Sequence, residues 1–371
     1  MPTTQKPNRA LNIMKYEPSL DGLRAIAILA VVLFHISNTY VPGGWAGVDI
    51  FFVLSGYLIT SLLIDEESQQ GTINFRNFYL RRLLRLAPAL VCLLAFQVAV
   101  AIASPNPAHR VDYLRAAVLS GFYLMNWNRA FGWFSEGLLG HTWSLSMEEQ
   151  FYLLWPLLFL FLRNKNSKRF LFIGIISIIA WRSLLAISGA SAERTYNGFD
   201  THSDGLLMGC FIAFMPWTNV KELARKTVTV PAIAILAIFL LLPYDARFTE
   251  TIGLSIAAFF AAWIVIALQG DSWIKRFLSL KLLVYTGRIS YGWYLWHYPI
   301  LLLAKAHVSA HGRPQVIALD AAIFVFSYLS AMFSFRFIEL PFLKIKRHFG
   351  FRTSERKEES SPAGETVVEP A

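Results

Sequence analysis

Charge and cysteine are scarce in this sequence. Only 16% of its 371 residues are charged and 55% are hydrophobic, whereas about 25% of the residues in ordinary soluble domains are charged. The two cysteines, Cys92 and Cys210, both fall in apolar stretches, so we expect core packing and no disulfide. The composition therefore favours a membrane protein over a soluble enzyme.

Other features are also missing. The sequence shows no repeat of roughly 20–50 residues, so nothing indicates a repeat-built transporter. Its first apolar stretch lacks a small-residue cleavage site and is too long for a signal peptide. No long polar region indicates an added soluble domain, and we predict no metal site.

What the sequence does contain is a series of long apolar stretches. A membrane-spanning helix needs about 20 largely apolar residues. The stretches lie near residues 21–41, 46–64, 83–103, 143–162, 170–188, 202–218, 229–243, 251–268, 283–303 and 316–338. They predict an all-α, polytopic transmembrane helix bundle with about ten spans.

Positive charge is unevenly distributed over this predicted bundle. With the N-terminus inside, the inner segments hold most of the 34 lysines and arginines, which predicts that both termini are cytoplasmic. This topology explains the net charge of +10 without a nucleic-acid partner. The basic inner rim suits anionic headgroups or an anionic cytosolic ligand. We divide the chain into a cytoplasmic tail (1–18), a membrane domain (19–343) and a basic, then disordered cytoplasmic tail (344–371).

The first predicted span contains two ionisable residues, Arg24 and His35. They are about three helical turns apart, roughly 16 Å, and lie on nearly the same face. We expect the guanidinium near the membrane edge and the imidazole near mid-bilayer, where ionisable groups are costly and usually functional. Histidine is also the side chain best suited to accept a proton near neutral pH.

Two further motifs each allow a structural and a functional interpretation. Arg82 and Arg85 share one face at the start of the third span; they bind either lipid headgroups, as a topology signal, or a phosphate ligand. Gly43, Gly44 and Asp49 open the second span, and they form either a turn with an interfacial acid or the wall of an acceptor pocket.

The fourth span opens with Trp143 and contains two adjacent carboxylates, Glu148 and Glu149. Carboxylates inside an apolar helix are hard to explain structurally. Because they point about 100° apart, only one easily faces a given partner. We expect one of them to pair with a buried histidine or arginine.

Four more ionisable residues lie in later spans. His297 is equally consistent with a core histidine and a catalytic one. Glu339 could balance the charge of the arginines or lie as an isolated interfacial acid. Arg182 and Asp204 are expected to form an ion pair.

Together, in this order, the motifs closely resemble those of the acyltransferase-3 family of integral membrane O-acyltransferases. The resemblance covers about residues 18–342 and rests on these segments: Leu20-Asp21-Gly22-Leu23-Arg24 to His35, Gly43-Gly44-x-x-Gly47-Val48-Asp49-Ile50-Phe51-Phe52-Val53-Leu54-Ser55-Gly56-Tyr57-Leu58-Ile59, Arg82-x-x-Arg85, Trp143-Ser144-Leu145-Ser146-x-Glu148-Glu149-Gln150-Phe151-Tyr152, and Ile289-Ser290-Tyr291 to His297-x-Pro299. It implies transfer of an acyl group, typically acetyl, from cytosolic acyl-CoA to a hydroxyl of a cell-surface or lipid-linked saccharide. It also implies a bacterial inner-membrane location, a standalone mode and glycan-assembly proteins as partners.

By this resemblance, His35 matches the family's essential histidine, Arg24 its partner and Arg82 and Arg85 the paired arginines. We expect His35 to act as general base, because the attacking hydroxyl must lose a proton, and Glu148 to orient it. Acyl-CoA is expected as a co-substrate held by the arginine pair, with no tightly bound cofactor. The acceptor pocket is expected to include Asp49, Gly43, Gly44, Trp143 and His297, supported by Glu149, Glu339, Arg182 and Asp204.

Two alternatives remain at this point. The chain could be a proton-coupled transporter of an acyl donor or a glycan that uses Arg24, His35 and Glu148 as its proton path. It could also be an acyltransferase for a small-molecule acceptor such as an antibiotic. A purely structural scaffold would explain neither the buried histidine nor the buried acids.

Overall fold

The computed structural model describes residues 16–163, 166–215, 218–244, 247–346 and 349. Every regular element in these ranges is a helix, which confirms the all-α prediction for the described part of the chain. Most of the two predicted tails, residues 1–15 and 350–371, lies outside the described residues.

The helices vary widely in length; the π-helical segment η2 leads into α13, and the π-helical segment η3 joins α17 to α18. The elements are α1 Pro18–Ile36, α2 Ala46–Gln70, α3 Phe75–Ala103, α4 Pro107–Gly121, α5 Met125–Phe131, η1 Gly140–Thr142, α6 Trp143–Leu162, α7 Ser167–Ile187, α8 Ala192–Asn197, α9 Phe199–His202, α10 Asp204–Ala213, α11 Thr218–Thr227, α12 Thr229–Leu241, η2 Thr249–Gly253, α13 Leu254–Ala267, α14 Trp273–Leu278, α15 Lys281–Arg288, α16 Ser290–His307, α17 Arg313–Phe333, η3 Ser334–Glu339 and α18 Leu340–Lys346.

Within the described ranges, seven helices are long and apolar enough to cross a membrane, or eight if the bent pair α11–α12 forms one span. A multi-pass helical bundle is thereby confirmed. The predicted sixth span is reduced to α10, which has ten residues. The predicted ninth span is divided between α15 and α16 at Ile289. The count of about ten and the cytoplasmic location of both termini stay predictions.

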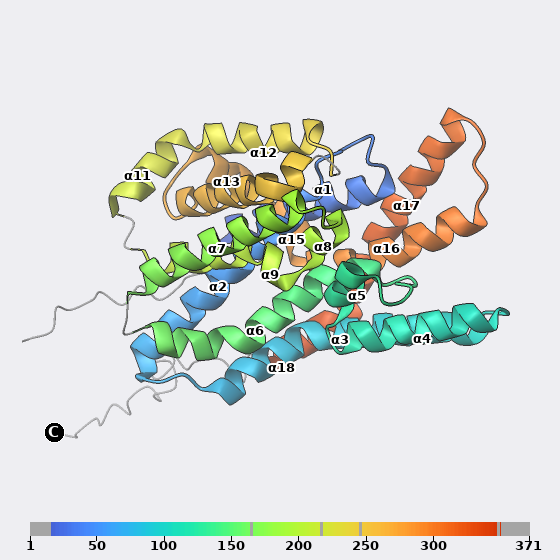
Figure 1. Cartoon of the computed structure of the whole chain (residues 1–371), viewed down its shortest axis with the longest axis horizontal. Coiled ribbons are helices and arrows are strands. Elements are labelled where there is room, and N and C mark those ends of the chain that lie inside the picture. The colour runs from blue at the N-terminus through green and yellow to red at the C-terminus, as the bar shows by residue number, and fades with distance from the viewer. Residues whose placement is uncertain (1–15, 164–165, 216–217, 245–246, 347–348, 350–371) are drawn as a thin grey trace, which may run out of the picture.

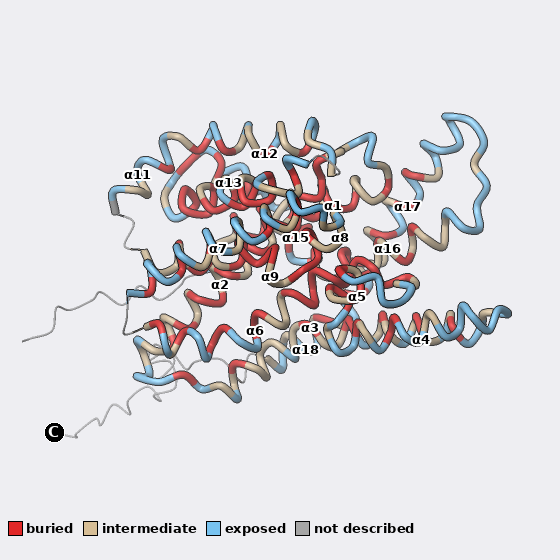
Figure 2. Tube along the Cα trace, in the orientation of Figure 1, coloured by how far each residue is buried: buried red, intermediate tan, exposed pale blue. Residues whose placement is uncertain are grey.

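The core of the bundle surrounds α1 and α2. Helix α1 packs against α2, α15 and α16, while α2 also packs along α10 and α13. Figure 2 shows buried residues concentrated in these central helices and exposed ones along α4, α12 and α17. The outer helices expose large apolar side chains such as Phe172, Leu240 and Phe326, which suits a surface in contact with lipid.

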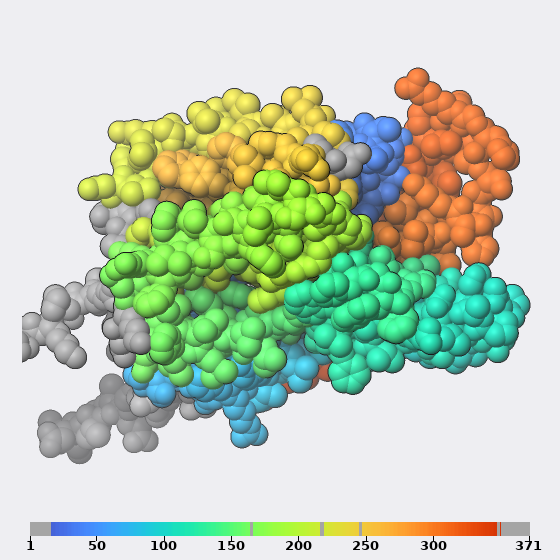
Figure 3. Space-filling view, in the orientation of Figure 1, coloured from blue at the N-terminus to red at the C-terminus, as the bar shows by residue number. Residues whose placement is uncertain are grey.

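The two ends of α1 define two regions that matter for function. Arg24, in the first half of α1, and Arg82 and Arg85, in the first half of α3, lie toward one end, which we call the arginine end. His35, in the last turn of α1, lies at the other, which we call the histidine end. The hairpin of α16 and α17 and helix α4 both project beyond the rest of the bundle on the right of Figures 1 and 3.

Candidate active site

A cavity of about 480 Å³ occupies the arginine end of the bundle. Residues of α1, α2, α3, α6, α15, α16 and η3 line it, so helices distant in sequence meet there. Its polar lining comprises Tyr16, Asp21, Arg24, Ser55, Arg82, Arg85, Ser144, Glu148, Tyr152, Arg288, Ser290, Tyr291, Tyr294 and Glu339. All four predicted cationic and acidic groups at positions 24, 82, 85 and 148 are thus in one cavity.

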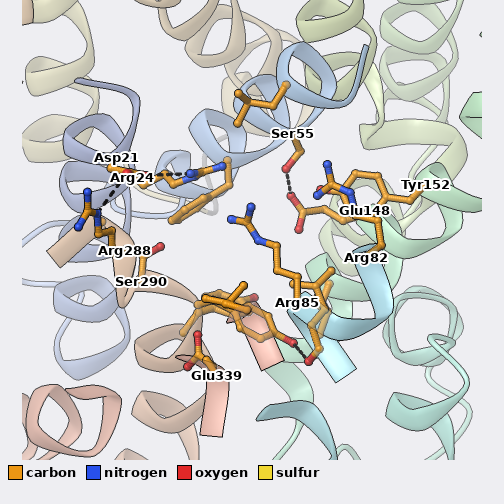
Figure 4. A pocket seen from close by; sticks show the side chains of 18 of the residues that line it. Asp21, Arg24, Ser55, Arg82, Arg85, Glu148, Tyr152, Arg288, Ser290 and Glu339 are labelled. Carbon is orange, nitrogen blue, oxygen red and sulfur yellow. Dashed lines mark hydrogen bonds and ion pairs between the residues drawn. The ribbon is translucent and has the colours of Figure 1, made fainter. Parts of the chain in front are cut away.

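Arg82 and Arg85 supply positive charge to this cavity without forming a direct ion pair among the described residues. Neither forms an ion pair with any carboxylate of the described chain, whereas their neighbour Arg81 pairs with Glu66 at 2.9 Å. Arg82 stacks over the ring of Tyr152, with its guanidinium carbon 4.7 Å from the ring centre. The guanidinium of Arg85 points into the middle of the cavity in Figure 4. Their fork-shaped donors are therefore available for an anionic ligand.

Arg24 lies in the same cavity but is partly neutralised. Its guanidinium donates to Asp21 at 2.8 Å. Asp21 also accepts from the hydroxyl of Tyr16 at 2.7 Å, and Arg288 donates to that hydroxyl at 2.8 Å. This chain of contacts forms the rim of the cavity on the left of Figure 4. Partial burial raises the pKa of Tyr16, which keeps its hydroxyl protonated.

Glu148 belongs to the arginine cavity and not to His35. Its carboxylate accepts from Ser55 at 2.5 Å and lies beside Arg82 in Figure 4. The hydrogen bonds of His35 within the described chain go instead to Val31 and His297. The expectation that Glu148 orients His35 is therefore wrong, because α6 presents this acid to α2 and α3 and not to the end of α1.

The other two predicted acids occupy different positions. Glu339 lines the cavity and accepts a hydrogen bond from Ser334 at 3.0 Å. It therefore lies with the arginines, which agrees with the interpretation that it balances their charge. It lies in the π-helical segment η3, and such segments often shape functional sites. Glu149 does not line the cavity, and its buried Oε1 has no hydrogen-bond partner among the described residues.

At the histidine end, three histidines from three segments pack together. His35 lies in the last turn of α1, and its depth near mid-bilayer stays a prediction. Its ring centre is 5.1 Å from that of His297 on α16, and His297 is 5.5 Å from His141 on η1. Tyr298 covers both His35 and His141, with ring centres 5.2 and 4.9 Å away. We call these four rings the histidine cluster.

This cluster is not arranged as a metal site. No group of three or more His, Cys, Asp or Glu side chains in the described ranges has the geometry to hold a metal ion. His141 and His297 are buried, while His35 is half-buried and so reachable by a substrate.

A hydrogen-bonded pair, Ser144 and Tyr294, separates the cavity from the histidine cluster. Both residues line the cavity, and their hydroxyl oxygens are 2.6 Å apart. The Tyr294 hydroxyl also donates to the carbonyl of His141, and the Tyr294 carbonyl accepts from His297 at 2.7 Å. The end of the cavity is thus in direct contact with the histidines.

Other predicted pocket residues lie elsewhere. Asp49 pairs with His202 at 3.0 Å, and Trp143 stacks on the same imidazole, 5.8 Å between ring centres. An added Cβ at Gly43 or Gly44 would lie 1.8 or 2.2 Å from a backbone carbonyl of α12 or α1. These glycines permit close helix packing, and neither they nor Asp49 and Trp143 line the arginine cavity.

The predicted ion pair between Arg182 and Asp204 is present. The two side chains are fully buried and 2.9 Å apart. Arg182 also donates to the carbonyls of Thr201 and Thr251, and Ser255 bonds both members of the pair. With every donor occupied, this pair holds α7, α10 and α13 together and is a structural element.

One cluster of charged residues at the histidine end was not predicted from the sequence. Arg129 on α5 pairs with Glu193 at 3.0 Å and with Glu136 at 3.3 Å. Ser55, Tyr294 and His141 were likewise not predicted as site residues, although all three fall inside or beside the motifs quoted above. The sequence signal that could have identified these residues is the presence of polar side chains within apolar helices.

Comparison with known proteins agrees with this geometry. Residues 17–336 match an acyltransferase domain. The chain belongs to the acyltransferase-3 family. It is 35% identical over 350 residues to an O-acetyltransferase OatA of Staphylococcus aureus, which covers 89% of this chain and 58% of that protein. It is 35% identical over 360 residues to the peptidoglycan O-acetyltransferase OatA of Listeria monocytogenes, covering 89% and 56%.

The chain spans little more than half the length of these relatives. No solved structure matches it.

Proposed function

We propose that this protein is a membrane-embedded O-acyltransferase that moves an acetyl group from acyl-CoA to a hydroxyl of a cell-surface or lipid-linked saccharide. One observation carries the proposal: a cavity that contains Arg82 and Arg85, neither in an ion pair with a described residue, ends on Ser144 and Tyr294, directly beside the histidine cluster. A site for an anionic donor and a candidate base are thus adjacent but separate.

The donor fits this arrangement through its charge and its length. Coenzyme A carries phosphates, which Arg82 and Arg85 bind with bidentate guanidinium hydrogen bonds. Arg24 and His35 are separated along α1 by roughly 16 Å. A donor whose phosphates lie at the arginine end must therefore carry its thioester on a long arm, as acyl-CoA does. The positive-inside rule supports a cytosolic arginine end.

The acceptor approaches His35 from the histidine end. The hydroxyl oxygen attacks the thioester carbonyl, a C–O bond forms and the C–S bond breaks. His35 takes the hydroxyl proton and returns it to the departing thiolate of coenzyme A, so the histidine is regenerated. A saccharide acceptor is supported by the relative from Listeria monocytogenes, whose name specifies peptidoglycan. Location in a bacterial inner membrane and association with glycan-assembly proteins belong to the same proposal.

The decisive experiment separates this function from transport. Protein purified in detergent is mixed with radiolabelled acetyl-CoA and a panel of acceptors: peptidoglycan disaccharide, other oligosaccharides and small hydroxylated antibiotics. The expected result is a labelled ester on a saccharide and an equal amount of free coenzyme A. A transporter gives no ester without a membrane gradient, and a label found only on an antibiotic would replace the saccharide acceptor.

A further inference from the structure

We propose that His297 is the positioning residue of His35: it accepts a hydrogen bond that fixes the base in its reactive tautomer. This inference rests on the proposed function, in which His35 is the general base. A base usually needs a second group to set its tautomer and orientation. The sequence suggested Glu148 for that role, and the structure places Glu148 elsewhere.

The protonation of His297 follows from its contacts. Its Nδ1 lies 2.7 Å from the carbonyl oxygen of Tyr294 and 3.1 Å from that of Trp293. A carbonyl oxygen can only accept, so Nδ1 carries the proton. In the neutral ring Nε2 is then an acceptor, and its lone pair faces Nδ1 of His35 at 3.3 Å.

The protonation of His35 follows in the same way. Its Nδ1 is 2.9 Å from the carbonyl oxygen of Val31, so this nitrogen also carries its proton. Two acceptors, the Val31 carbonyl and Nε2 of His297, therefore face the same N–H. This leaves the lone pair of His35 on Nε2, where it can take a proton from an acceptor hydroxyl.

The neutral partner also suits the charge that develops in the reaction. When His35 takes a proton on Nε2, its Nδ1–H becomes a stronger donor, and the two acceptors stabilise the imidazolium. Burial of His297 favours its neutral form, so the pair carries a single positive charge. A second cation beside His35 would oppose that protonation.

The backbone of α16 supports this arrangement through Pro299. Proline has no N–H, so the carbonyl of Leu295, four residues earlier, has no helical donor. His141 donates from Nε2 to that carbonyl at 3.2 Å. His141 and His297 are thus both anchored to the same stretch of α16, so the positions of these two histidines depend on one helix.

Two substitutions of His297 separate positioning from packing. In His297→Gln, the amide oxygen occupies the place of Nε2 and keeps an acceptor for His35. In His297→Asn, the amide nitrogen occupies the place of Nδ1 and keeps the bond to Tyr294, but the acceptor is lost. Initial rates are measured with acetyl-CoA and the saccharide acceptor. We expect kcat to fall about a hundredfold in His297→Asn and less than about tenfold in His297→Gln. The KM for acetyl-CoA should stay within about twofold of the parent, because the donor cavity is untouched.

His307 offers a matched control on the same helix. Its Nδ1 also contacts the carbonyl four residues earlier, at 2.9 Å, but the ring is exposed and outside the cluster. His307→Asn and His307→Gln should both retain the parent kcat. Correct folding of every variant is checked by size-exclusion chromatography in detergent.

The outcomes distinguish this inference from the proposed function. If His297→Asn retains activity and His297→Gln loses it, the bond to Tyr294 is what matters, and the positioning role of His297 is overturned. Equal kcat values in all variants would overturn that role as well. If the parent forms no acetyl ester, or His35→Ala remains active, the proposed function itself fails. If His35→Ala is inactive and kcat is higher in His297→Gln than in His297→Asn, both the proposed function and the positioning role of His297 are supported.

Discussion

The arginine cavity and the histidine cluster lie at opposite ends of α1 and are built from different contacts. In the cavity, long charged side chains meet a polar space, and two of the guanidiniums have no acidic partner in the described chain. In the histidine cluster, aromatic rings pack against each other, and each imidazole contacts a backbone carbonyl.

This difference teaches how one membrane domain can separate binding from chemistry. A charged donor needs mobile, multiply donating groups that adapt to phosphates. A general base needs one fixed tautomer in a dry site, which backbone carbonyls provide without adding charge. Ser144 and Tyr294 form the boundary, because both line the cavity, Ser144 bonds to the Tyr294 hydroxyl, and Tyr294 bonds to His141 and His297.

The largest effect should come from removing His35, the proposed base. His35→Ala is expected to lower kcat at least about a thousandfold, while binding of acetyl-CoA stays unchanged because the arginines are intact. Titration calorimetry for the donor and ester formation for the reaction measure the two separately. Loss of donor binding in a correctly folded His35→Ala protein would show that the two regions are not independent.

Removing the paired arginines should have the opposite signature. Arg82→Ala combined with Arg85→Ala is expected to raise the KM for acetyl-CoA about 10–100-fold, as lost charge-assisted hydrogen bonds would. Arg82→Lys combined with Arg85→Lys should restore the KM only partly, because lysine lacks the bidentate fork. Arg81→Ala is the control, since Arg81 already pairs with Glu66. Reduced membrane insertion with an unaltered KM would identify the pair as a topology signal.

The smallest effect distinguishes the two assignments of Glu148. As a member of the cavity, its neutralisation makes the site more positive, so Glu148→Gln should lower the KM for acetyl-CoA a few-fold, by about 1 kcal/mol of electrostatic energy. Its kcat should change less than about tenfold. Glu149→Gln, outside the cavity, should match the parent. A hundredfold fall in kcat for Glu148→Gln alone would restore its assignment to His35.

Much of the fold could be predicted because apolar length is a local property. The spans predicted at α1, α2, α3, α6, α7, α13 and α17 are present. The predicted third span began at residue 83, whereas α3 begins at Phe75, because a helix continues into polar sequence where hydropathy gives no signal. The predicted ninth span failed as one helix because hydropathy cannot show the break at Ile289.

The sequence by itself determined which residues are costly in a membrane: Arg24, His35, the arginine pair and the buried acids stand out because apolar surroundings penalise charge. Only the tertiary structure decided their partners. Spacing along one helix gives the face of a side chain but not the helix that packs against it. For that reason Glu148 was placed beside His35 from the sequence, while the packing of α16 against α1 puts His297 there.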